Sequence, residues 1–294
     1  MTHPNRPVFV LTSLIVLLAL VTAGLGVFWQ GSGEPFPFTT LRGETVMISG
    51  HGLYTYDSVS IVAQAVAQDW VTLLLGIPLL LLGLFLTQRG SLRGRLLLTG
   101  TLGYFLYTYA SYAFGAAYNV LFLVYVALFS LSLFAFVLAV MGLDVHSLAG
   151  HFSDRLPRRL IAGFLFVVGG FLLLAWLGRI VPGLLTGAPP VGLEANTTLF
   201  IQVLDLGLIV PAAFLAGVLL WRRSSWGYLL ASIVLVKGFT LSISVSAMAL
   251  NMVLAGVTVS PVEVVVFPAL TLVGVGLTAV LFKNLNPASS RPAH

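Results

Sequence analysis

Residues 229–252 read LLASIVLVKGFTLSISVSAMALNM, a stretch that is apolar enough to lie in lipid and yet contains Lys237 near its middle. A helix needs about 20 mostly apolar residues to cross the hydrocarbon core of a bilayer, and other stretches of this chain are similarly long and apolar. Of the 294 residues, 59% are hydrophobic and 8% are charged, whereas soluble domains have about 45–50% apolar and about 25% charged residues. The sequence therefore predicts an all-α, polytopic membrane protein.

Eight transmembrane helices are predicted, at roughly residues 7–29, 66–87, 96–115, 118–141, 160–181, 198–220, 227–251 and 262–282. Most basic residues fall on one side of these spans: Arg6, Arg89, Arg93, Arg95, Arg155, Arg158, Arg159, Arg222, Arg223, Lys283 and Arg291. Basic residues favour the cytoplasmic side, so we expect a multi-pass protein of the cell membrane with cytoplasmic N- and C-termini. The alternative for the first span is a cleaved signal peptide.

An internal repeat is predicted when the chain is compared with itself at a shift of 133 positions. Residues 76–98, GIPLLLLGLFLTQRGSLRGRLLL, then align without a gap with residues 209–231, IVPAAFLAGVLLWRRSSWGYLLA. The alignment pairs Pro78 with Pro211, Arg89 with Arg222, Ser91 with Ser224, and Gly94 with Gly227. We expect two parallel four-helix repeats, residues 1–142 and 159–294 with a short tail, joined by a cytoplasmic linker at 143–158. Chance similarity of two helical hairpins is the alternative.

Polar residues concentrate in the outer halves of the predicted spans. Counted from the nearest cytoplasmic arginines, Asp205 lies roughly 25 Å and Lys237 roughly 21 Å above the inner boundary. A lone charge in the bilayer centre costs about 2.5–3.5 kcal/mol on insertion scales, so we expect Lys237 to meet Asp205 or a hydrated cavity that includes it. A purely structural ion pair is the alternative. The predicted substrate- or ion-binding residues are Asp205, Lys237, Asp69, Gln202, Tyr104, Tyr107, Gln68 and Asn251.

Three functions are compatible with this pattern. The first is a transporter or channel-like protein that binds a small polar solute or ion in an outward-facing polar cavity. The second is a membrane subunit, assembly factor or sensor, in which the polar groups are structural and a membrane protein is the partner. The third is an intramembrane enzyme that acts on a lipid-linked substrate, with Asp69 or Asp205 as base. No set of nucleophile, base and orienting residue is visible in the sequence, which argues against the enzyme.

The sequence also argues against several cofactors and partners. The chain has no cysteine, which excludes iron–sulfur clusters, and no histidine within a predicted span, which argues against haem. No phosphate-binding loop of the Walker type is present. Lys237 in a seventh span resembles the lysine of retinal-binding rhodopsins, but the third span lacks a carboxylate and Ile233 stands one turn before the lysine. We predict no cofactor, no metal site and no nucleic-acid partner; the lipid bilayer is the expected environment.

Overall fold

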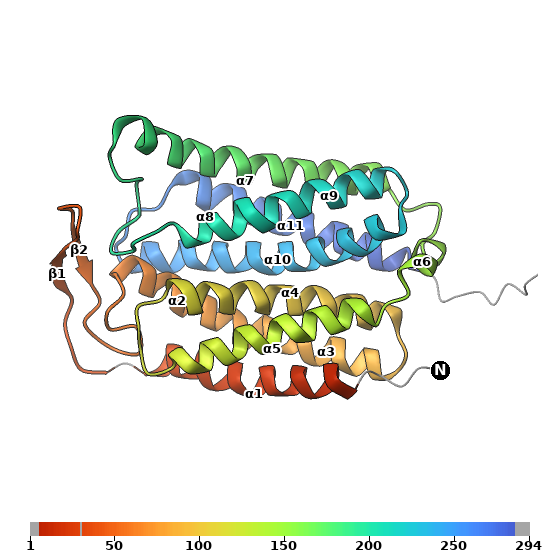
Figure 1. Ribbon diagram of the computed structural model, residues 1–294, viewed down its shortest axis with the longest axis horizontal. Coiled ribbons are helices and arrows are strands. Elements are labelled where there is room, and N and C mark those ends of the chain that lie inside the picture. Colours follow the sequence, from red (N-terminus) through yellow and green to blue (C-terminus); the bar gives the residue numbers. More distant parts are fainter. Residues whose placement is uncertain (1–5, 30, 286–294) are drawn as a thin grey trace, which may run out of the picture.

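The computed structural model of this protein describes residues 6–29 and 31–285, which form a bundle of long helices that run side by side (Figure 1). Among these residues, seven helical segments are long and apolar enough to cross a membrane. They are α1 (Arg6–Phe28), α2–η1–α3 (Val59–Gln88), α5 (Phe122–Met141), α7 (Arg158–Thr186), α8–η3–α9 (Phe200–Trp221), α10 (Ser225–Leu254) and α11 (Pro261–Lys283). The protein is therefore a multi-pass integral membrane protein.

The third predicted span corresponds to helix α4 (Leu92–Gly115), which has the length but not the apolarity of the other seven. It packs against α3, α5 and α10, and 15 of its 24 residues are buried. Its threonines and tyrosines therefore face protein more than lipid. A helix in this position does not need an apolar surface on every side, which explains why α4 is less apolar than its neighbours.

The helical architecture is as predicted, and the segment between α1 and α2 adds a short β-hairpin that was not predicted. Strand β1 (Phe36–Thr39) pairs antiparallel with strand β2 (Thr45–Ile48), with Phe36 opposite Ile48. Gly43 in the turn has a φ of 82°, a conformation that glycine adopts without a steric cost. The hairpin lies beyond the helix ends, on the side of the bundle opposite the N-terminal end of α1 (Figure 1).

The helices fall into two groups, α1–α5 and α7–α11, which Figure 1 places on opposite sides of the bundle. The two groups meet where α10 packs against α2 and α4, and where α8 packs against α4. At Gly100 of α4, a Cβ atom would lie 2.5 Å from the Cβ of Val236 in α10. Glycine at this position therefore allows the central helices of the two groups to approach closely.

Two of the spanning segments contain a π-helical turn at matching places. Segment η1 (Thr72–Gly76) connects α2 (Val59–Val71) to α3 (Ile77–Gln88), and η3 (Asp205–Ile209) connects α8 (Phe200–Leu204) to α9 (Val210–Trp221). Pro78 and Pro211 are the second residues after these segments, and proline has no N–H for the usual helical bond. The residue before each proline donates instead to the carbonyl five positions back, as Val210 does to Asp205. Each proline thus explains a local widening of its helix.

Both described ends of the chain lie at the end of the bundle opposite the hairpin (Figure 1). There, a connecting segment with the short helices α6 (Val145–Leu148) and η2 (Ala149–His151) contacts the residues that follow α11. Phe152 forms a β-bridge with Leu285, and Arg93 Nη2 donates to the Leu285 carbonyl at 2.6 Å. The predicted basic clusters lie at helix termini on this side; Arg291 is outside the described residues.

Candidate functional site

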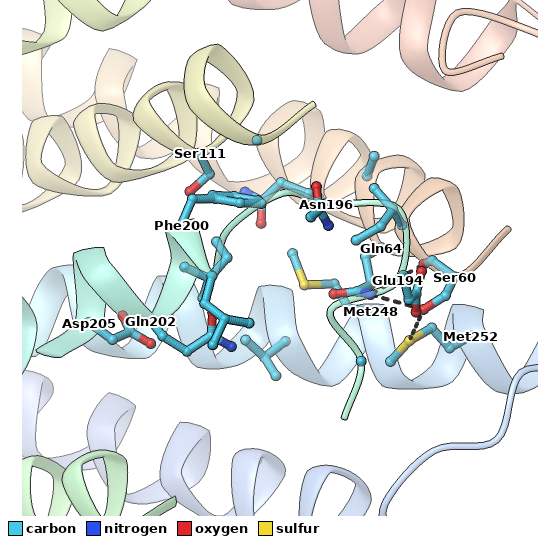
Figure 2. Close-up of a pocket in the computed structure, with 18 of the residues that line it drawn as sticks. Ser60, Gln64, Ser111, Glu194, Asn196, Phe200, Gln202, Asp205, Met248 and Met252 are labelled. Atoms are coloured by element: carbon cyan, nitrogen blue, oxygen red, sulfur yellow. Dashed lines mark hydrogen bonds between the residues drawn. The ribbon is translucent and has the colours of Figure 1, made fainter. Parts of the chain in front are cut away.

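A cavity of about 610 Å³ lies between the two helix groups, toward the end of the bundle that carries the hairpin. Figure 2 shows the side chains that surround it. Helices α2, α4, α7, α8, α10 and α11 contribute to its lining, together with the connection between α7 and α8. The residues labelled in Figure 2 are Ser60, Gln64, Ser111, Glu194, Asn196, Phe200, Gln202, Asp205, Met248 and Met252. The cavity therefore has the size of a small-molecule site, which is about 300–1,000 Å³.

Asp205 lines this cavity and is itself buried, with 4% of its surface exposed. It is the first residue of η3, so the π-helical turn begins at its position. Its Oδ1 accepts a hydrogen bond from the Tyr107 hydroxyl at 2.8 Å, and its Oδ2 accepts one from Trp176 Nε1 at 2.9 Å. Two donors from two different helices thus hold this carboxylate in place, and no basic side chain of the described residues bonds to it.

Lys237 does not contact Asp205 directly, which corrects the expected ion pair. Its Nζ has no hydrogen-bond partner among the described residues and lies 3.9 Å from the centroid of the Tyr107 ring. The same tyrosine donates to Asp205 through its hydroxyl, so both charged side chains contact Tyr107, Lys237 at the ring and Asp205 at the hydroxyl. The contact is a cation–π interaction, worth about 2 kcal/mol or more when both groups are desolvated. Lys237 is buried and does not line the cavity.

Four of the predicted site residues line the cavity: Asp205, Gln202, Tyr107 and Gln68. Tyr104 lies behind Gln68, because the Gln68 amide donates to the Tyr104 hydroxyl and to Thr108 Oγ1. Tyr104 is fully buried and also lies 3.4 Å from the Ser244 hydroxyl of α10. It therefore supports a lining residue and links the two helix groups.

The remaining two predicted residues belong to other contacts. Asp69 is buried away from the cavity, where it accepts hydrogen bonds from the hydroxyls of Tyr54 at 2.5 Å and Tyr112 at 3.0 Å. Asn251 Nδ2 donates to the Ala63 carbonyl at 2.7 Å and thereby joins α10 to α2. The structure thus places neither Asp69 nor Asn251 at the cavity, although both Tyr54 and Tyr112 line it.

Asp57 is a lining residue that the predicted site did not include. Only 6% of its surface is exposed, and its Oδ1 accepts a hydrogen bond from the Ala117 N–H at 2.9 Å. Its Oδ2 is buried and has no hydrogen-bond partner among the described residues. Burial raises the pKa of Asp57 to about 6, although the hydrogen bond from Ala117 acts in the opposite direction. The recurrence of polar residues at positions 57, 60, 64 and 68 was the available sequence signal.

Trp176, Glu194 and Glu263 also line the cavity and were not predicted as site residues. Tryptophan in the outer part of a span is usual at the membrane interface, so its position alone does not indicate a bond to Asp205. Glu194 lies in the connection between α7 and α8, where it has a φ of 51° and accepts a hydrogen bond from the Ser58 hydroxyl. These residues meet only through the packing of distant segments.

Among the described residues, no group of three or more histidine, cysteine, aspartate or glutamate side chains is arranged to hold a metal ion. Comparison of the chain with protein-family models, with characterised proteins and with solved structures found no match.

Proposed function

We propose that this protein is a transporter or channel-like protein that takes up a small polar or ionic solute from the outer side into the cavity between its two helix groups. The observation that carries this proposal is the position of Asp205, a buried carboxylate in the cavity wall. Ionisable groups within membrane spans are costly and in general mark substrate or ion pathways. The two donors to Asp205 compensate its burial and leave its charge facing the cavity.

Lys237 supports the same interpretation. A lysine that served only to fix the helix register would be expected to contact its carboxylate partner directly, because a buried charge without a partner is unfavourable. Here both side chains contact Tyr107 instead, Lys237 at the ring and Asp205 at the hydroxyl. A movement of the ammonium from the ring to the carboxylate would give the site a second arrangement. We propose that solute binding shifts the balance between these two arrangements.

The topology that we propose has eight spans, with α4 as the third in chain order. The basic residues at the end opposite the hairpin support a cytoplasmic location for that end and for both termini. The cavity then opens to the outside of the cell membrane. The spans number four in each group, so the two groups insert in the same direction.

We further propose that the two groups, residues 1–142 and 159–294, arose by duplication, with residues 143–158 as the linker. The π segments support this, because Thr72–Gly76 and Asp205–Ile209 differ by the 133 positions of the sequence alignment. Helices α3 and α9 keep the same shift at both ends. Under this alignment, Asp205 corresponds to Thr72 and Lys237 to Tyr104. Only the second copy therefore has charged residues at these two aligned positions.

Single-cysteine labelling tests the topology and the access to the cavity, since the natural chain contains no cysteine. Ser111→Cys lies in the cavity wall, and Ser147→Cys lies in the linker and is exposed. In intact cells, a membrane-impermeant maleimide should label Ser111→Cys and should label Ser147→Cys only after permeabilisation. A Ser111→Cys protein that reacts only with a membrane-permeant reagent would contradict an outward-open cavity.

Solute movement is tested with the protein reconstituted in liposomes on a solid-supported membrane. Charge displacement on addition of amines, amino acids and inorganic ions should occur with the natural protein and should be reduced in Asp205→Asn. The exposed residue Glu44 provides the matched control, because Glu44→Gln removes an acid outside the cavity. Equal currents in the natural protein and in Asp205→Asn would remove Asp205 from the pathway.

A further inference from the structure

The cavity is strongly acidic in a chain that is basic overall. Of the nine Asp and Glu residues of the chain, four line it, whereas among the described residues only one Lys or Arg does. The acids are Asp57, Glu194, Asp205 and Glu263, and the basic residue is Arg179. A cavity wall with this excess of one charge concentrates ions of the opposite sign. The charge of the wall therefore favours a cation as ligand and disfavours an anion.

Asp57 provides a second and independent indication of a ligand. Its Oδ2 is buried without a hydrogen-bond partner among the described residues, although the side chain forms part of the cavity wall. A buried acceptor that lacks a donor is unfavourable, and natural structures rarely retain one without a reason. A positively charged N–H group in the cavity would supply the missing donor.

The rest of the wall indicates what kind of cation fits. Six aromatic side chains line the cavity, and so do two methionines at helical spacing on α10, Met248 and Met252. Aromatic faces attract alkylammonium groups, and methionine adapts to apolar ligands of varied shape. The aromatic residues are Tyr54, Tyr107, Tyr112, Trp176, Phe200 and Phe267.

An inorganic cation fits this wall less well than an organic one. Calcium takes six to eight oxygen ligands and magnesium requires an octahedral oxygen shell, whereas no group of three acidic or histidine side chains is arranged around a common point in the described residues. The volume of about 610 Å³ also exceeds what a single ion needs. It accommodates an ammonium group together with an apolar body.

We propose that the cavity binds an organic cation, an ammonium group attached to an aromatic or aliphatic body, with the free oxygen of Asp57 as an acceptor for the charged group. The apolar body then lies against the aromatic and methionine side chains, and Asp205 contributes a second negative charge from the π segment. This inference rests on the proposed function, because it names the class of solute that enters the same cavity.

Protection of a cavity cysteine from labelling tests this inference. The probes are benzylammonium, benzyl alcohol and phenylacetate, which share an aromatic ring and differ in charge. With Ser111→Cys protein, benzylammonium should slow the reaction with maleimide, and the neutral and anionic probes at the same concentration should not. Adding Asp57→Asn should raise the concentration of the cation needed for half-protection by about tenfold or more, the loss expected for one charge-assisted hydrogen bond. Adding Glu44→Gln instead should leave it unchanged.

The outcomes separate this inference from the proposed function. If the cavity cysteine is labelled from outside but all three probes protect it equally, or none does, or phenylacetate protects best, the organic-cation inference is overturned while the accessible cavity stands. If protection by the cation is the same with and without Asp57→Asn, the assignment of Asp57 is overturned. If the cysteine cannot be labelled from outside at all, both the inference and the outward-open cavity fail.

Discussion

Replacing Asp57 by asparagine should stabilise the protein at neutral pH, although it changes a residue of the cavity wall. Burial raises the pKa of this carboxyl group from 3.8 to about 6. One pKa unit corresponds to about 1.4 kcal/mol, so the ionised carboxylate costs the folded protein about 3 kcal/mol. Asparagine keeps an oxygen that can accept the hydrogen bond from Ala117 and removes the charge, and this cost disappears with it.

The raised pKa of Asp57 also determines whether the free energy of unfolding rises or falls with pH. Between about pH 4 and about pH 6, the folded protein binds more protons at Asp57 than the unfolded chain does. Its free energy of unfolding therefore falls as the pH rises through this range and stays lower above it. Asp57→Asn lacks this contribution. The variant should exceed the natural protein in stability by the largest amount above about pH 7 and by almost nothing near pH 4.

Thermal unfolding in a single detergent, followed by the fluorescence of the five tryptophans, measures this difference. Phosphate buffer is required, because an amine buffer would itself supply an organic cation. A gain of about 3 kcal/mol corresponds to an increase in melting temperature on the order of 5–10 °C. The exposed control Glu44→Gln should change the melting temperature little at either pH. An Asp57→Asn protein that melts at or below the natural protein at neutral pH would refute the reasoning.

Two further predictions concern the contacts that hold the site together. Tyr107→Phe removes the hydroxyl that donates to the buried Asp205 and should lower the free energy of unfolding by about 1–3 kcal/mol. Tyr107→Leu also removes the ring that Lys237 contacts and should lower the free energy of unfolding by about 2 kcal/mol more. Chemical denaturation in mixed micelles measures both losses. Equal losses would show that the ring does not stabilise the ammonium. Gly100→Ala forces a methyl group against Val236 and should lower the free energy of unfolding by about 1–3 kcal/mol. Gly163→Ala is the control, because no atom lies within 4 Å of the added carbon. This control should leave the stability unchanged or raise it slightly.

The helix bounds could be predicted well from apolarity, while the exceptions have physical causes. The second span was expected to begin at residue 66, but α2 begins at Val59 because the Ser58 side chain caps it by accepting the Ile61 N–H. Polar residues such as Ser60 and Gln64 belong to this additional length, where they face the cavity. A hydropathy profile assigns such residues to a loop, because it contains no information on the neighbouring helices that shield them from lipid.

The site could be predicted in part, because helical spacing places residues of one helix on a common face. This spacing does not give the rotation of one helix against another. That rotation brought Lys237 to the Tyr107 ring and not to Asp205, and it turned Asp69 toward Tyr54 and Tyr112 instead of the cavity. Equal depth in the membrane was therefore not sufficient to establish a contact.

The sequence by itself determined that this chain is a multi-pass membrane protein and where most of its helices lie, since both follow from runs of apolar residues in consecutive positions. It also indicated that the strongly polar groups of the spans lie toward one end. The tertiary structure alone decided which of these groups share a cavity, that Trp176 and Tyr107 hold Asp205, and that one oxygen of Asp57 has no hydrogen-bond partner among the described residues. Those facts depend on side chains from helices that are distant in sequence, whose relative rotation is set by close packing such as that of Gly100 against Val236.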